Sequence, residues 1–119
     1  MARAEAMSAF EVQLVDESTL RLQGALGFAT AATALAAGER MINAGSAKLQ
    51  IDCAGLTHVD SAGLAVLLEW LAMAARRSRP IGWINLPESL RQLAAISEDI
   101  QRIFMRTSQK NDLQFNARD

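Results

Sequence analysis

The segment from Leu49 to Leu71 constrains the fold more than any other part of the chain. Apolar and polar residues alternate over residues 48–53, which predicts a half-buried strand. A loop then ends in Asp60-Ser61-Ala62-Gly63, and a leucine-rich run predicts a helix from about Ser61 to Ser78. This order places a hydroxyl in the first turn of a helix. Unpaired N–H groups and the positive dipole end there can hold a phosphate or an acceptor group of a partner.

The other elements predict an α/β domain built on one mixed sheet. Two alternating segments predict a hairpin that ends at Gly24, and an alanine-rich segment predicts a helix between an N-cap at Thr30 and a stop at Gly45. The order β-β-α-β-α-β-α gives a single domain with a mixed four- to five-stranded sheet covered by helices. The expected bounds are 10–14 and 19–23 for the hairpin, 30–44 for the first helix and 81–86 for a central fourth strand. A third helix is expected to begin at Pro87 and to bury Leu90, Leu93 and Ala94.

The chain has room for one domain and one core, because it has 119 residues and half of them are hydrophobic. Ile100, Ile103 and Phe104 form the last apolar group, so we expect the domain to span residues 10–104. Residues 1–9 are expected to be a flexible leader and residues 105–119 a flexible polar tail.

Composition excludes several classes of protein. The 12 basic and 13 acidic residues give a net charge of −1, which argues against a nucleic-acid-binding protein. A single cysteine cannot form a disulfide within the chain, which fits a reducing compartment. The first eight residues lack the apolar core of a secretory signal, and the longest apolar run, Leu64–Ala75, is too short to span a membrane. We therefore expect a cytoplasmic protein.

Neither catalysis nor metal binding is predicted. Cys53 lies on the apolar face of its strand, where cysteine behaves as a small hydrophobic residue, and His58 is the only histidine. One histidine and one cysteine cannot form a usual zinc site. The chain contains no phosphate-binding loop, nucleophile elbow or dinucleotide fingerprint, so we expect a non-enzyme without a cofactor.

The helix after Asp60 carries more apolar side chains than one buried stripe needs. A stripe on one side is sufficient to cover the sheet, yet the opposite side is also largely apolar. This second face predicts a docking surface for a partner, unless a loop or the C-terminal segment of the same chain covers it. The stripe expected to face the sheet is Leu64, Leu67, Leu68, Leu71 and Ala75, and the opposite side carries Ala62, Val66, Glu69, Met73 and Arg77 with Trp70 at its flank.

Three other features have structural interpretations. Gly38 interrupts a helix and is costly there, so we expect a close approach to the sheet at this position. Arg76, Arg77 and Arg79 could contact lipid head groups or nucleotide, but their place at a helix C-terminus favours a solvated, dipole-stabilised end. Trp83 lies within a strand and is expected in the core.

The residues Ile51-Asp52, then Val59-Asp60-Ser61-Ala62-Gly63-Leu64 and a leucine-rich helix, resemble the motif of STAS domains. This fold is shared by bacterial anti-sigma-factor antagonists, sulfate-transporter tails and a subunit of phospholipid transporters. The Gly24 turn and the Asn85-Leu86-Pro87 segment before Leu90 and Leu93 add to the resemblance, which covers about residues 10–104.

The resemblance implies one of two functions. In antagonists the hydroxyl after the Asp is phosphorylated by a partner anti-sigma kinase, which breaks the complex. In the MlaB-like branch the domain docks on the ATPase subunit of an ABC transporter and supports phospholipid trafficking and lipid asymmetry of the outer membrane. This chain has Gly24-Ala25-Leu26-Gly27 where antagonists usually have Gly-Glu-Leu-Asp, and Ser61-Ala62-Gly63 where they often have Ser-Ser-Gly. These departures favour the transporter branch.

The roles implied for the motif are specific. Asp60 would order the loop by accepting backbone N–H bonds, Ser61 would supply a hydroxyl at the contact, and Gly63 would let the partner approach closely. Ordinary N-capping by Asp60 and Ser61 is the alternative, and capping and contact with a partner can occur together. The protein would contact the inner membrane only through its ATPase partner, or else Ser61 would be the phosphoacceptor of an anti-sigma factor kinase. The expected partner-binding residues are Asp60, Ser61, Ala62, Gly63, Val66, Trp70 and Met73.

Overall fold

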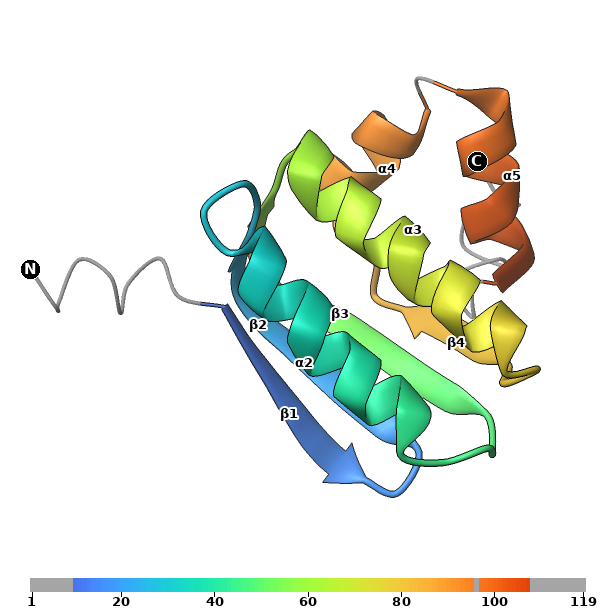
Figure 1. Cartoon of the computed structure of the whole chain (residues 1–119). Coiled ribbons are helices and arrows are strands. Elements are labelled where there is room, and N and C mark those ends of the chain that lie inside the picture. The colour runs from blue at the N-terminus through green and yellow to red at the C-terminus, as the bar shows by residue number, and fades with distance from the viewer. Residues whose placement is uncertain (1–9, 96, 108–119) are drawn as a thin grey trace, which may run out of the picture.

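A computed structural model describes residues 10–95 and 97–107 (Figure 1). In this part of the chain a mixed sheet packs against helices in the predicted α/β order. The strands are β1 (Phe10–Asp16), β2 (Thr19–Leu26), β3 (Leu49–Val59) and β4 (Ile81–Ile84), and the helices are α2 (Ala31–Asn43), α3 (Ser61–Arg76), α4 (Glu88–Ala94) and α5 (Glu98–Thr107).

The sheet has four strands in the order β1-β2-β3-β4. β1 and β2 form the predicted antiparallel hairpin, whereas β2 pairs with β3 and β3 with β4 in parallel. The expectation that the fourth strand is central is therefore wrong, because β4 is an edge strand. Its apolar sequence has another cause: Trp83 is completely buried and its ring lies 5.3 Å from that of Phe104 on α5, which covers this edge.

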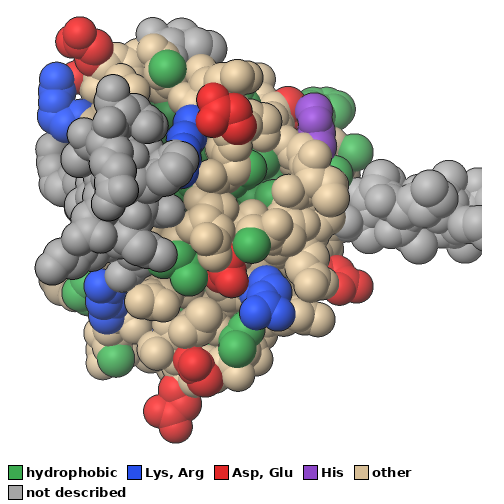
Figure 2. Space-filling view, turned by 180° about the vertical axis from the view of Figure 1, so that it is seen from behind, with side chains coloured by type: hydrophobic (Ala, Val, Ile, Leu, Met, Phe, Trp, Pro, Cys, Tyr) green, Lys and Arg blue, Asp and Glu red, His purple; other side chains and the backbone are tan. Residues whose placement is uncertain are grey.

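The helices lie on one face of the sheet, with α2 and α3 side by side in front of β2 and β3 (Figure 1). The other face carries charged and polar side chains. Arg21 of β2 pairs with Asp52 of β3 at 3.7 Å, and the amide of Asn85 donates to the same carboxylate at 2.9 Å. Figure 2 shows this rear face, where acidic and basic side chains lie among hydrophobic ones. The core therefore lies between the sheet and the helices, and it includes Cys53 as predicted.

Several element bounds differ from the predicted ones. β2 continues through Gly24, whose positive φ of 94° fits glycine, to Leu26. β3 continues through the expected loop to Val59, because parallel pairing with β2 extends to Leu26. The C-terminal apolar group is part of α5, an additional helix that crosses the expected boundary at residue 104. The leader at 1–9 and residues 108–119 of the expected tail lie outside the described residues.

Arg79 is buried, which corrects the expectation of a solvated arginine cluster. Its guanidinium donates to the backbone oxygens of Ala47 at 2.7 Å, Met41 at 3.0 Å and Ile42 at 2.8 Å. Arg79 therefore satisfies carbonyl groups at the end of α2, where the helix dipole favours a cation. Arg77 stays exposed, as expected.

No helix in the described part of the chain combines the length and the apolar character that crossing a membrane requires.

Candidate functional site

Asp60 holds two segments together at the carboxyl ends of β2 and β3. As the N-cap of α3, its Oδ1 accepts the amide of Gly63 at 3.0 Å. Its Oδ2 accepts the amide of Phe28, in the loop between β2 and α2, at 3.2 Å. The amides of Gly63 and Phe28 lower the pKa of Asp60 because they stabilise the charged carboxylate. The predicted acceptance of backbone N–H groups by Asp60 is confirmed, and it includes a loop that is distant in sequence.

The loop before α2 has its own hydrogen bonds. The hydroxyl of Thr30 donates to the Ala25 carbonyl at 2.8 Å and accepts the Gly27 amide at 3.1 Å. Thr30 is the N-cap residue by position, but its side chain binds this loop and makes no capping hydrogen bond to α2. A Cβ at Gly27 would lie 2.6 Å from Oδ2 of Asp60, so only glycine allows the carboxylate this close. The loop conformation thus depends on Gly27, Thr30 and Asp60 together.

Ser61 is exposed at the first position of α3, as the sequence predicts, and Ala62 beside it is half-buried. Gly63 is buried, and a Cβ there would lie 2.1 Å from the carbonyl oxygen of Leu26. The expectation that Gly63 lets a partner approach is therefore wrong. Its missing side chain instead lets α3 begin directly against the end of β2.

Phe28 is the residue at this site that the sequence analysis missed. It is 86% exposed, the largest exposure among the large hydrophobic residues that the structure describes as exposed. Its amide is bound to Asp60, so the backbone of this exposed aromatic residue lies next to the N-terminus of α3. The available signal was a lone aromatic residue among small ones, between Gly27 and the start of a helix.

Trp70 and Val66 belong to the core, which contradicts their predicted place on a free apolar face. Trp70 is completely buried and Val66 is 5% exposed. A Cβ at Gly38 of α2 would lie 2.0 Å from the Trp70 indole, so the close approach at Gly38 is to α3 and not to the sheet. Met73 is half-buried and packs against the core. The second apolar face of α3 therefore packs largely against α2, and not against the loop or C-terminal segment considered as cover above.

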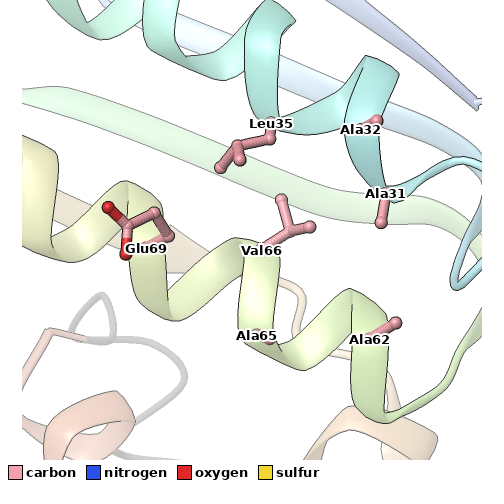
Figure 3. A pocket seen from close by; sticks show the side chains of 7 residues that line it. All are labelled: Ala31, Ala32, Leu35, Ala62, Ala65, Val66 and Glu69. Atoms are coloured by element: carbon pink, nitrogen blue, oxygen red, sulfur yellow. The ribbon is translucent and has the colours of Figure 1, made fainter.

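An open apolar groove remains between the first turns of α2 and α3 (Figure 3). Leu35 of α2 and Val66 of α3 both point into the space between the helices, and Glu69 lies at its far end. Both helices begin at the same end of this groove, near the Phe28 loop and Ser61. Its lining consists of Ala31, Ala32, Leu35, Ala62, Ala65, Val66 and Glu69.

The described residues offer no catalytic or metal-binding cluster. Cys53 is completely buried whereas His58 is exposed, so the two do not form a nucleophile–base pair. No group of three or more His, Cys, Asp and Glu side chains that could hold a metal ion occurs in this part of the chain. What this end of the domain does present is an exposed phenyl ring, an exposed hydroxyl and an apolar groove.

Replacing Asp60 with alanine is expected to lower the free energy of unfolding by about 1 kcal/mol, because the cap of α3 is lost. The folded protein holds the Asp60 pKa below its usual range, so the stabilisation is complete above about pH 4 and is lost as the pH falls through the lower folded value. Urea unfolding at pH 7 and at pH 3 measures both effects. Equal losses of stability in the variant at pH 7 and at pH 3 would contradict this account.

The chain was compared with known proteins by sequence and by structure. The family model described as "Mlab, STAS domain" matches residues 10–98. A comparison with curated proteins gives no match. Two solved structures have similar folds: the unphosphorylated anti-sigma factor antagonist SpoIIAA (TM-score 0.57, 17% identity, 79% of this chain and 96% of that chain) and the phosphorylated cell fate determinant SpoIIAA of Bacillus (TM-score 0.62, 14% identity, 91% and 98%).

Proposed function

The chain belongs to the STAS domain family, and we propose that it is an MlaB-like, non-catalytic subunit that docks on the ATPase of an ABC transporter and supports phospholipid trafficking. The docking end would be the Phe28 ring and the Ser61 hydroxyl, because Asp60 binds the Phe28 amide and directly precedes Ser61. In this proposal the protein is cytoplasmic and reaches the inner membrane only through its partner. The transport of phospholipid by that complex would maintain the lipid asymmetry of the outer membrane.

The observation that carries the proposal is the exposed Phe28 ring. Exposing an aromatic ring is unfavourable unless a partner covers it, and aromatic residues are enriched among those that dominate binding energy. Phe28 lies on a loop that Asp60 and Thr30 fix in place, so little conformational freedom would be lost on binding. An apolar anchor on a preorganised loop suits docking on a second protein.

The residue at position 27 also favours the transporter branch. Antagonists usually carry Asp at this position, whereas here Gly27 leaves the space that the Asp60 carboxylate occupies. An acidic side chain at position 27 would put two carboxylates together and disturb the hold of Asp60 on Phe28. The loop of this chain thus suits a fixed conformation in which Asp60 keeps its hold on the Phe28 amide.

Phe28→Ser and Ser61→Arg are each expected to weaken binding to the transporter ATPase at least about tenfold while leaving the unfolding midpoint nearly unchanged. The first change removes the apolar anchor, and the second places a long charged side chain at the contact. Titration of the purified ATPase with labelled protein measures the affinity. Leu14→Ser is the matched control, because Leu14 is 56% exposed but lies on β1, away from the site. Full affinity in both site variants would overturn the proposal.

The alternative function is that of an anti-sigma factor antagonist, for which the exposure of Ser61 is the favouring observation. A phosphate on Ser61 would stand next to the Asp60 carboxylate, and the repulsion would loosen the Phe28 loop. Intact mass after incubation with cell extract and ATP, with Ser61→Ala as control, separates the two functions. A phosphorylated species that Ser61→Ala lacks would favour the antagonist, and its absence would favour the transporter subunit.

A further inference from the structure

We propose that the groove between α2 and α3 receives an amphipathic helix of the partner, and that a lysine or arginine of that helix pairs with Glu69. The inference rests on the proposed function and extends it, because it gives the chemistry of the partner segment. It concerns the groove lined by α2 and α3 (Figure 3), not the Phe28 ring and Ser61 hydroxyl already assigned to docking.

The shape of the groove suits a helix. Four of its seven lining residues are alanines, two on each helix, so the walls are low and another backbone can come close. Val66 and Leu35 lie between the two helices and add larger apolar side chains to the lining. A row of large aliphatic side chains on a partner helix would fit into this depression, as ridges fit into grooves where helices pack.

The charge of the groove suits a cation at one end. Glu69 is the single ionisable residue in the lining. Its carboxylate contacts Arg76 at 3.5 Å, but both side chains are about half exposed or more, and such a surface pair contributes little. Glu69 can therefore exchange Arg76 for a basic side chain of the partner, where burial of the interface would strengthen the pair.

The spacing along α3 sets where that cation must lie. Ala62 and Glu69 are seven positions apart, which corresponds to roughly 10 Å or two helical turns. The partner helix should thus present apolar side chains over about two turns. Its basic residue should follow at the end of this stretch that is remote from Phe28.

A larger side chain at an exposed position of the lining would fill the groove without altering the core. Ala65 is an exposed residue of the lining, so Ala65→Leu should fold normally and weaken binding of the purified transporter ATPase about tenfold. Ala75→Leu is the matched control, because Ala75 is exposed on the same helix but outside the groove, and its affinity should change less than twofold. Equal affinities for the two leucine variants would overturn the inference.

The charge is tested by Glu69→Lys against Glu39→Lys, an exposed position on α2 outside the groove. Only the first should weaken binding, and the loss should shrink in high salt. A photocrosslinker at position 65 should capture a helical ATPase segment that carries a lysine or arginine, whereas capture of a loop or strand would overturn the inference. If the unaltered protein binds no ATPase, the proposed function fails and the inference fails with it; binding that these variants leave unchanged refutes the inference alone.

Discussion

Replacing Trp70 with alanine is expected to lower the free energy of unfolding by about 3–5 kcal/mol, a large part of the stability of a domain of this size. The indole is completely buried where α3 packs against α2, so its removal leaves a cavity between the two helices. Chemical unfolding of the variant followed by circular dichroism measures the loss. Because Trp70 is part of the core and not of the exposed site, binding to the proposed ATPase partner should fall only in proportion to the unfolded fraction.

The same contact predicts that the effect of Gly38→Ala on the free energy of unfolding depends on whether the Trp70 indole is present. In the natural sequence Gly38→Ala should destabilise by about 2 kcal/mol, because the added Cβ would lie 2.0 Å from the indole. With Trp70→Ala already present, Gly38→Ala should be neutral or stabilising by up to about 1 kcal/mol, since alanine is the better helix former.

A double-mutant cycle over these two positions measures the coupling directly. Ala36→Gly on the exposed side of α2 is the control for helix propensity, and it should cost about 1 kcal/mol in both backgrounds. If Gly38→Ala destabilises equally with and without the indole, the close packing of α2 against Trp70 is not the reason for the glycine.

The sequence predicted the elements of the sheet and the N-terminus of α3 well because both depend on local patterns. Alternation located the hairpin and the start of β3, and the Asp60-Ser61 pair located the helix start that the structure confirms. The structure also confirms the STAS-like mixed sheet with a cover of helices.

The burial of Trp70 and Val66 could not be read from the periodicity of α3. The pattern identifies apolar faces but not what covers them. α3 packs against both the sheet and α2, so two of its faces are buried. From the sequence, one face was expected in the core and the other under a partner, a loop or the C-terminal segment. Gly38 was the signal for the helix–helix contact, but a glycine does not show which element approaches it.

The Phe28 loop and Arg79 were missed for a different reason: each depends on contacts between segments that are remote in sequence. Asp60 binds the Phe28 amide across 32 positions, and Arg79 reaches the end of α2 across 37 and 38 positions. Such hydrogen bonds have no sequence period. They become visible only when the topology brings the carboxyl ends of β2 and β3 together, or the start of β4 next to the end of α2.

Replacing Arg79 with methionine is the second change expected to have a large effect, a loss of about 3 kcal/mol in the free energy of unfolding. Methionine keeps the apolar length of the side chain but removes the donors to the carbonyls of Ala47 and Ile42. The Met41 carbonyl also loses Arg79 but keeps the amide of Ala44 at 3.2 Å. Burial lowers the Arg79 pKa, yet arginine remains charged at neutral pH. Its charge is stabilised by carbonyl dipoles at the C-terminal end of α2.

Two further variants identify the cause of this loss. Arg79→Lys keeps the charge but not the fork of donors that reaches several carbonyls at once, so its stability should fall between those of the methionine variant and the natural protein. Arg77→Met is the matched control, because Arg77 is exposed and makes a single long contact with the Asn43 carbonyl at 3.4 Å, and it should cost less than about 0.5 kcal/mol. Hydrogen exchange should show faster exchange in the last turn of α2 in Arg79→Met. Equal losses for Arg77→Met and Arg79→Met would show instead that general charge, and not the carbonyl contacts, is responsible.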